Sequence, residues 1–549
     1  MLKLLRFPMT KKLPMGLLAA LAVTFLLGLP YLGSEPLWFD EVLSWSVYRH
    51  SASPVEMIGY LAQYENHPPL YYLMMAGWIR AVGDSAFALR GFSLLFALLS
   101  VGLLYGLARE WFGRTTASAA AMAMALSPFF VEFSREARPY MMLTAFAIGG
   151  WFTLSRWQRT GSRAAIIGFG VLALAGLYTH YAYWFVLGSQ VLAALMFIPR
   201  AVPNGGRQLA AALGGILFAY LPWVPVLAKN LLAQYRTVGD LTPLSSLTQP
   251  ENFLPLDVVM NFLFFPSKWP VDAFGRLLQG STLLLLAVGA GLVALIAWRR
   301  VRQGDAAATN RWQRLVLVGM WVVAPLLLFL VSPLSGRYSW YYQRHVLFVL
   351  PAVAVAVVLA GQELLARSRL GFSPTVVAAA VVCAYVLMNS PQYFTNDATW
   401  DPQHQFPAVV QAIEDQERGG RELIVGFWPN YRILLDYYYH GGQTVGSLVP
   451  EAIGSRQLTI ASGSPRQTPV EGYLLTHPHI PYRDYRLPSD LSRYDRLWVV
   501  SVTPSLFDLD IALIAAGWTP TYVPLPQPLK IFLFRFDRLA GLCRPMAGS

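Results

Sequence analysis

Two acidic residues, Asp40 and Glu41, stand side by side shortly after the first long apolar segment of the chain. A second short motif follows at residues 65–72 (ENHPPLYY). A charged side chain at membrane depth costs roughly 2.5–3.5 kcal/mol on insertion scales, so such groups tend to mark functional sites. A carboxylate here could accept the proton of a hydroxyl nucleophile. The alternative is that Asp40 and Glu41 only begin a solvated loop.

Other polar residues lie near the ends of later apolar segments, on the side of the membrane that carries Asp40. Arginine binds phosphate through two parallel hydrogen bonds, and a carboxylate can deprotonate an attacking hydroxyl. Together these residue types fit the displacement of a phosphate leaving group whose charge arginine neutralises. The candidates are Asp40, Glu41, Glu65, His67, Tyr71, Glu136, Arg138, Tyr140, His180, Tyr181, Arg337, Tyr341 and Arg344.

Several of these candidates also have a purely structural interpretation. Glu136 and Arg138 could form a local ion pair between two spans. Arg337 and Arg344 could anchor the chain to lipid headgroups. His180 could be a structural histidine in a tight turn. The sequence leaves these alternatives open.

The composition is that of a membrane protein with one soluble part. Of the 549 residues, 55% are hydrophobic and 13% are charged, whereas soluble domains carry about 25% charged residues. Cys383 lies in an apolar segment and Cys543 in the C-terminal tail, so we expect no disulfide, and no Cys/His spacing is typical of zinc.

Apolar windows of about 20 residues are long enough to cross the hydrocarbon core of a bilayer. The sequence predicts eleven such spans. We place them at 14–32, 86–108, 115–131, 139–155, 164–179, 182–199, 208–228, 280–298, 315–332, 345–361 and 373–390.

Basic residues favour one side of the membrane. The alternating connections that begin with residues 1–13 hold 18 Lys and Arg in 62 residues, and those that begin with 33–85 hold 10 in 125. The positive-inside rule therefore predicts a cytoplasmic N-terminus, with the first span kept as an anchor. The net charge of +12 is largely this topology signal, so nucleic acid is not needed to explain it.

The connection 33–85 is too apolar for a free linker. Its segments 54–63 and 69–82 have the spacing of amphipathic helices, which we expect to lie along the membrane surface. The start of the second segment, 66–69 (NHPP), could be only a helix start, because proline suits the first turn.

The composition changes near residue 391. We therefore expect a transmembrane module at 1–390, whose first external loop 33–85 carries the acidic motif, and a soluble α/β domain at 391–549 outside the cytoplasm. The C-terminal domain is predicted to hold both strands and helices. The strands are placed at 421–426, 496–502, 519–523 and 530–536, and the helices at 406–416 and 505–516.

Short motifs follow one another in a fixed order: 38–41 (WFDE), 67–72 (HPPLYY), 84–90 (DSAFALR), 134–140 (SREARPY), 179–181 (THY) and 344–347 (RHVL) with Pro351. This series resembles membrane glycosyltransferases of the GT-C fold. It is similar to the bacterial family related to protein O-mannosyltransferases, lipid A aminoarabinose transferase and rhizobial lipopolysaccharide galacturonosyltransferases. The soluble tail, with 436–439 (DYYY), is also similar to that family.

The resemblance implies transfer of a sugar from a polyprenyl-phosphate carrier to a hydroxyl at the outer face of the membrane. By it, Asp40 would be the catalytic base or the acid that orients the acceptor, and Glu41 would support it, while Arg138, Arg337 and Arg344 would hold the lipid phosphate. The supporting or substrate-binding residues would be Glu65, His67, Tyr71, Glu136, Tyr140, His180, Tyr181 and Tyr341.

The resemblance leaves metal dependence open, with Mg²⁺ or Mn²⁺ at Glu41 and His67 as the site to consider. The acceptor could be a lipid, a glycan or a protein. Two rival functions differ in class. A transporter or flippase of lipid-linked sugars would favour internal repeats and charges at the membrane midplane, which the sequence does not show. A receptor or scaffold would leave Asp40 and Glu41 unexplained.

The topology prediction can be tested with reporter fusions. Because basic residues are retained in the cytoplasm, a reporter fused at Asp305 should be cytoplasmic and one fused after Ser390 should be external. An external reporter at Asp305 would contradict the order of the spans.

Overall fold

The computed structural model divides into two compact units. The first unit comprises Met1–Leu32, Asn66–Val82 and Ala88–Thr395, and the second comprises Gly33–Glu65, Gly83–Phe87 and Asn396–Ser549. The structure describes residues 14–49, 51–64, 67–196, 202, 204–238, 311–322, 343–367, 382–387, 389–390, 393, 405–426, 429–450, 458–461, 487–501, 506, 509–525 and 531–538.

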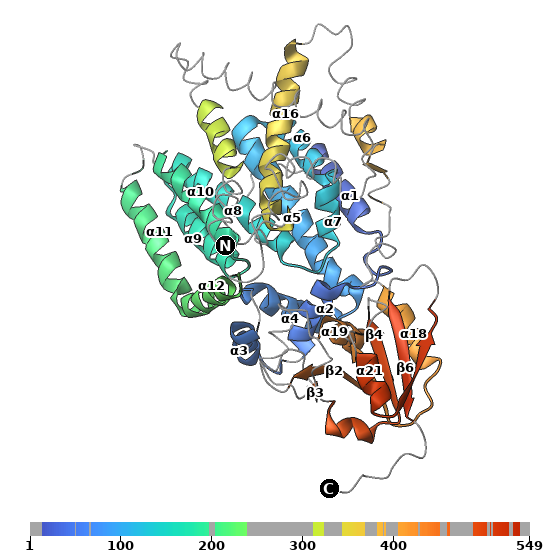
Figure 1. The fold of residues 1–549 in the computed structure, drawn as a ribbon. Helices are drawn as coiled ribbons and strands as arrows, with labels where there is room; N and C mark the ends of the chain where they lie inside the picture. The colour runs from blue at the N-terminus through green and yellow to red at the C-terminus, as the bar shows by residue number, and fades with distance from the viewer. Residues whose placement is uncertain are drawn as a thin grey trace. The chain divides into compact units, whose positions relative to one another are not determined.

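The described part of the first unit is helical (Figure 1). Three of its helical stretches are long and apolar enough to cross a membrane: Ala86–Phe112, Gly205–Leu232 and His345–Ala366. The helices are α1 (Met15–Gly28), α4 (Leu70–Val82), α5 (Ala86–Phe112), α6 (Arg114–Ala125), α7 (Pro128–Ser134), α8 (Tyr140–Thr160), α9 (Arg163–Leu177), α10 (Tyr183–Met196), α11 (Gly205–Tyr220), η1 (Leu221–Trp223), α12 (Val224–Val238), η5 (Gln343–Val349) and α16 (Leu350–Arg367).

A sharp bend separates α6 from α7. The two helices together are apolar enough for a fourth span, but they meet at 65°. Pro128 begins α7, and the side chain of Ser127 accepts the backbone N–H of Phe130 at 3.4 Å. A proline at the first helical position and a serine cap are typical helix-start signals, so the bend is encoded locally.

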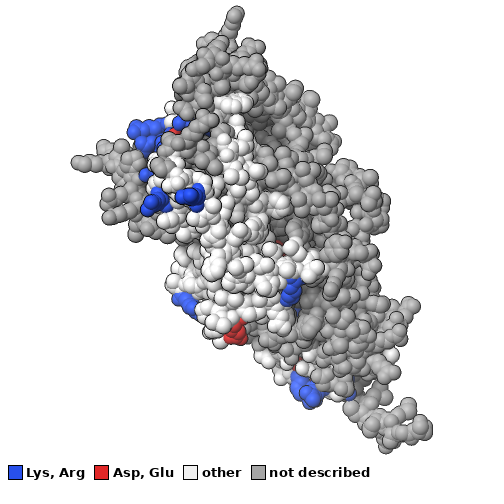
Figure 2. All heavy atoms as spheres, turned by 90° about the vertical axis from the view of Figure 1, so that its left-hand side faces the viewer, with Lys and Arg blue, Asp and Glu red and all other residues white. Residues whose placement is uncertain are grey.

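The surface beside α11 is apolar. Figure 2 shows a broad uncharged stretch on this face, with Lys and Arg gathered near its upper end in that view. Large side chains are exposed there, including Ile167 (63%), Leu217 (54%) and Phe218 (75%). Such a continuous apolar face is what a helix presents to lipid rather than to water.

The second unit contains two helices from the N-terminal part of the chain, α2 (Phe39–Arg49) and α3 (Pro54–Tyr64), and a six-stranded sheet. The strand order is β3-β2-β1-β4-β6-β5. The central strand β1 runs parallel to both neighbours, and the outer pairs are antiparallel. The C-terminal elements are α18 (Phe406–Glu414), β1 (Glu422–Gly426), α19 (Pro429–Tyr438), β2 (Thr444–Pro450), β3 (Leu458–Ala461), η9 (Ser489–Arg493), β4 (Arg496–Ser501), α21 (Leu509–Ala515), β5 (Trp518–Val523) and β6 (Phe532–Arg538).

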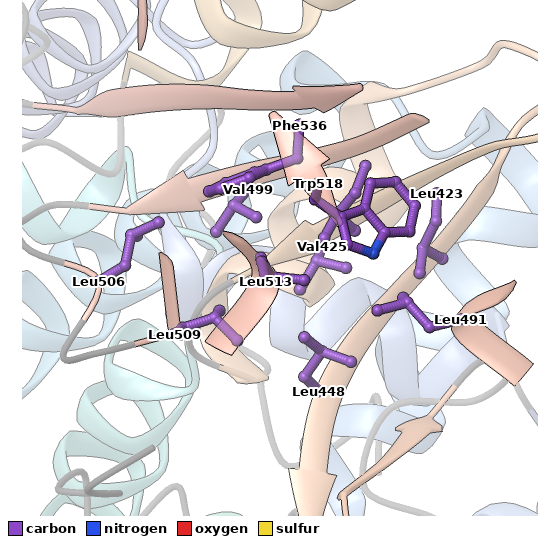
Figure 3. Close-up of a cluster of buried hydrophobic side chains, with 11 residues drawn as sticks. Leu423, Val425, Leu448, Leu491, Val499, Leu506, Leu509, Leu513, Trp518 and Phe536 are labelled. Carbon is purple, nitrogen blue, oxygen red and sulfur yellow. The ribbon is translucent and has the colours of Figure 1, made fainter. Parts of the chain in front are cut away.

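One face of this sheet carries a compact apolar core (Figure 3). Leu423 and Val425 of β1 pack there with Val499 of β4, and α21 contributes Leu509 and Leu513. Every residue of β1 and β4 is buried, as expected of central strands covered on both faces. Helix α19 contacts β1 and β2 but adds no residue to this core.

Most elements that the sequence predicts are present where they can be checked. The helices at 54–63, 69–82, 406–416 and 505–516 correspond to α3, α4, α18 and α21, and the four predicted strands correspond to β1, β4, β5 and β6. The sequence did not predict α2, α19, β2 or β3. The span at 280–298 lies outside the described residues, as do most of those at 315–332 and 373–390.

The domain assignment stays a prediction, but the structure adds one fact to it. Residues 33–65, predicted as an external loop of the membrane module, group with the C-terminal segment into the second unit. The helix that carries the acidic motif therefore contacts C-terminal residues of the same unit.

Close packing of α19 on β1 allows a test. A Cβ at Gly426 would lie 2.4 Å from the backbone nitrogen of Arg432, and overpacking of this kind costs about 1–3 kcal/mol. Gly426→Ala should lower the temperature at which a protease begins to cut residues 396–549 in the full-length protein. Gly442→Ala is the control, because its Cβ would meet nothing within 4 Å. Equal melting of both variants would contradict this packing.

Candidate active site

The acidic motif forms the first turn of α2. Trp38 is the cap, because the backbone N–H groups of Glu41 and Val42 both donate to its carbonyl oxygen at 3.0 Å. The Glu41 carboxylate accepts the backbone N–H of Trp38 at 3.3 Å in return. This contact is the half of a capping box in which an acidic third residue satisfies the cap N–H. Glu41 thus has a structural role that fixes the start of α2.

The two carboxylates differ in exposure. Glu41 is buried, with 1% of its surface exposed, while Asp40 is half-buried. The partial positive charge at a helix N-terminus stabilises acidic side chains in the first turn. By exposure, Asp40 is the more accessible of the two carboxylates, and Glu41 is the buried one. The interpretation of the pair as a mere solvated loop is wrong, since both residues lie in a helix.

Side chains distant in sequence hold α2 in place. The indole N–H of Trp45 donates to the Asp84 carboxylate at 3.0 Å, and the Trp45 ring meets the Tyr437 ring edge-on, with centroids 4.9 Å apart. The Tyr438 hydroxyl donates to the carbonyl oxygen of Leu37 at 2.9 Å. Sequence reasoning did not include these residues among the site candidates. Their signal was present, because Asp84 and the two tyrosines belong to motifs that carried the resemblance.

In the first unit, an aromatic cluster gathers residues from four segments. The ring of His180 lies 5.5 Å from that of His67, 4.9 Å from that of His345 and 6.1 Å from that of Tyr140. The Tyr140 ring is also 5.9 Å from that of His345. The structure therefore brings together three predicted candidates, and it adds His345, which the sequence prediction did not include.

His180 is oriented by the backbone. Its Nδ1 accepts the N–H of Ala182 at 3.1 Å, so the neutral ring carries its proton on Nε2. His180 and Tyr140 are both buried, at 6% and 1% exposure. A buried imidazole of fixed tautomer can orient a polar ligand, so this cluster is a candidate binding surface as well as a packing contact.

Other predicted candidates in the first unit make packing contacts. The Tyr71 ring lies 5.9 Å from that of Phe92. The Tyr181 hydroxyl accepts hydrogen bonds from Trp223 and Asn230, at 3.1 and 3.3 Å. Both tyrosines therefore help to hold neighbouring helices together.

The structure describes the side chains of some arginine and glutamate candidates and not those of others. Arg138 is buried, and its carbonyl oxygen accepts the Ser93 hydroxyl at 3.4 Å. Glu136 lies two residues before it, and its carbonyl oxygen accepts the Arg138 N–H. Glu65, Arg337 and Tyr341 lie outside the described residues, and so does the side chain of Arg344, which belongs to η5.

Glu41 and His67 are the metal ligands considered from the resemblance. No three His, Cys, Asp or Glu side chains in the described part of the chain gather as they would around a metal ion. Glu41 uses one carboxylate oxygen on the Trp38 N–H, and His67 belongs to the other unit. Metal dependence stays a prediction.

Comparison with known proteins agrees with the geometry. Residues 66–227 match the family model described as dolichyl-phosphate-mannose-protein mannosyltransferase. ArnT from Cupriavidus metallidurans in the apo state is 14% identical, with a TM-score of 0.55 over 96% of this chain and 98% of that chain. The chain has a GT-C fold.

Two further structures share the GT-C fold. ArnT bound to undecaprenyl phosphate is 14% identical, with a TM-score of 0.54 over 96% of this chain and 99% of that chain. The archaeal oligosaccharyltransferase AglB from Archaeoglobus fulgidus, in complex with an inhibitory peptide and a dolichol-phosphate, is 12% identical. Its TM-score is 0.50 over 97% of this chain and 74% of that chain. No curated protein matches the sequence. The resemblance to GT-C proteins is confirmed, while eleven spans and an external C-terminal domain stay predictions.

The capping role of Glu41 gives a prediction. Glutamine keeps an acceptor oxygen for the Trp38 N–H, and alanine does not, at a cost of about 1 kcal/mol. In Glu41→Ala, the amides of residues 39–43 should exchange with deuterium roughly fivefold faster than in the parent protein. In Glu41→Gln, exchange should stay near the parent rate. Equally fast exchange in both variants would show that the charge, and not the acceptor, holds the turn.

Proposed function

We propose that this protein is a membrane glycosyltransferase that moves a sugar from a polyprenyl-phosphate donor to a hydroxyl acceptor. The observation that carries the proposal is a half-exposed aspartate in the first turn of a capped helix, in a chain of GT-C fold. The family description and the lipid phosphates bound to ArnT and AglB support a lipid-linked donor.

In the proposed reaction Asp40 is the general base. It accepts the proton of the acceptor hydroxyl as the hydroxyl oxygen bonds to the anomeric carbon of the sugar. The bond between that carbon and the carrier phosphate breaks, and the phosphate oxygen leaves with the electron pair. Asp40 then returns the proton to water.

The arginines neutralise the charge that develops on the leaving phosphate. Arg138 is the candidate whose side chain the structure describes, buried just before α8. Arg337 and Arg344 are proposed for the same role from the sequence. His67, His180 and Tyr140 would orient polar groups of the substrate.

The reaction is proposed to take place at the outer face of the plasma membrane. The distribution of Lys and Arg supports this orientation, because it favours a cytoplasmic N-terminus and an external motif. Nucleotide sugars are not supplied on that side, whereas a lipid-linked sugar reaches it through the bilayer. The acceptor is a hydroxyl of a lipid, a glycan or a protein.

Asp40→Asn tests the proposed base. Asparagine keeps the size and one acceptor oxygen but cannot take up the proton, so transfer should fall by roughly 10²–10⁴-fold. The purified protein should remain folded and should still bind the lipid-linked donor. Transfer is measured from the donor to a hydroxyl acceptor in detergent or liposomes.

Glu56→Gln is the matched control for Asp40→Asn. Glu56 is likewise an acidic residue in the first turn of a helix of the second unit, and its carboxylate accepts the Ala52 N–H at 2.8 Å. Glutamine keeps that contact, so transfer should stay near the parent rate. An Asp40→Asn enzyme with more than about half of the parent rate would rule out the base assignment.

A further inference from the structure

The segment just before the acidic motif is held by the C-terminal domain. The Tyr438 hydroxyl, at the end of α19, donates to the carbonyl oxygen of Leu37 at 2.9 Å. Leu37 is fully buried, and a buried carbonyl needs a hydrogen-bond partner. It directly precedes Trp38, the cap of α2, and lies three residues before Asp40. This contact therefore fixes the backbone at the point where α2 begins.

A second contact holds the middle of α2. Trp45 lies five residues after Asp40 and is 8% exposed. Its ring packs edge-on against Tyr437, and its indole N–H donates to Asp84. Tyr437 in turn packs edge-on against Tyr438, with ring centroids 4.8 Å apart. Two consecutive tyrosines of α19 thus contact α2 near its start and along its side.

Helix α19 is itself firmly seated. Ile433, Leu434 and Leu435 are buried at 1%, 0% and 0% exposure, and the helix contacts β1 and β2 of the sheet. Gly426, at the end of β1, permits the close approach of the α19 backbone. The tyrosines therefore extend from a helix packed against the sheet, so they can define the position of a partner helix.

We propose that the C-terminal domain positions the catalytic aspartate, with Tyr438 and Trp45 as positioning residues for Asp40. This inference rests on the proposed function. A general base must lie within hydrogen-bond reach of the proton that it accepts, and a misplacement of about 1 Å can cost roughly 10²-fold in rate. Tyr438 fixes the entry to α2 and Trp45 fixes its direction, so together they set the location of Asp40.

The first experiment removes one hydroxyl. Tyr438→Phe keeps the ring contacts but loses the hydrogen bond to Leu37, and we expect kcat to fall roughly threefold to tenfold. The KM for the lipid-linked donor should stay unchanged, because the variant displaces the base and not the donor phosphate. A variant that is only destabilised would instead contain less active enzyme, with an unchanged kcat per active site. Active-site titration measures the amount of active enzyme, so the kcat value can be corrected for this loss.

Tyr439→Phe is the matched control. Tyr439 follows directly in sequence, its hydroxyl donates to Glu417, and it accepts the N–H of Gln443 at 3.1 Å. Burial raises the pKa of this hydroxyl above its usual value. Both partners belong to the C-terminal segment, so the variant loses the hydrogen bonds of a neighbouring tyrosine hydroxyl without removing a contact to α2. Its kcat should match that of the parent enzyme.

Conservative replacement at Asp84 gives an independent check on Trp45. Asp84→Asn keeps an acceptor oxygen for the Trp45 indole N–H, and Asp84→Ala removes it. We expect kcat to be largely retained in the asparagine variant and lowered roughly threefold to tenfold in the alanine variant. Equal kcat in the two variants would exclude the Trp45 contact as a positioning element.

Hydrogen exchange separates failure of this inference from failure of the proposed function. In Tyr438→Phe, the amides of residues 37–45 should exchange faster than in the parent, whereas those of α3 should not change. Faster exchange with a parent-like kcat would overturn the positioning role but leave the proposed function intact. A parent enzyme without transfer activity would overturn the proposed function and with it this role, and unchanged exchange would show that α19 does not hold α2.

Discussion

A backbone inside hydrocarbon has no water to hydrogen-bond, so each N–H and C=O group must find its partner within the protein. Within the described residues, the apolar part of this chain meets that constraint as helices, and several polar side chains lie where helices begin or end. The aromatic cluster shows this pattern. Tyr140 begins α8, His180 lies between α9 and α10, and His345 lies in η5 before α16.

The helix that carries Asp40 and Glu41 is stabilised in a different way. It has only 11 residues, and isolated helices of fewer than about 12–15 residues are marginal in water. Its stability must therefore come from its cap and its packing. Glu41 supplies the first by accepting the Trp38 N–H, and α19 supplies the second through Tyr437 and Tyr438.

The GT-C fold alone does not establish an activity, because one fold can support several functions. Function depends on which side chains the fold brings to the site. Asp40 is partly exposed while its neighbour Glu41 is buried and bonded, so the pair divides into one residue at the surface of the helix and one that shapes the turn. The same division explains why two adjacent carboxylates need not act together.

The sequence identified the elements whose signal is local. Strands β1 and β4 are continuous apolar runs, and α18 and α21 have apolar residues at helical spacing, so periodicity alone located them. Strand β2 (TVGSLVP) contains Gly, Ser and Pro, which weaken a strand signal, and it was missed. Helix α2 was missed because its first turn is acidic and its mean composition is only weakly apolar.

The sequence by itself determined the acidic motif and the resemblance to GT-C proteins, because these depend on residue types and their order. Only the tertiary structure showed that the buried Glu41 accepts the N–H of the cap residue Trp38 and that the Tyr438 hydroxyl donates to the Leu37 carbonyl oxygen. Those two residues are 401 positions apart, and no local pattern encodes a contact across such a separation. The contact forms because α19 packs on the sheet and its last turn lies against Leu37, the residue before the cap of α2.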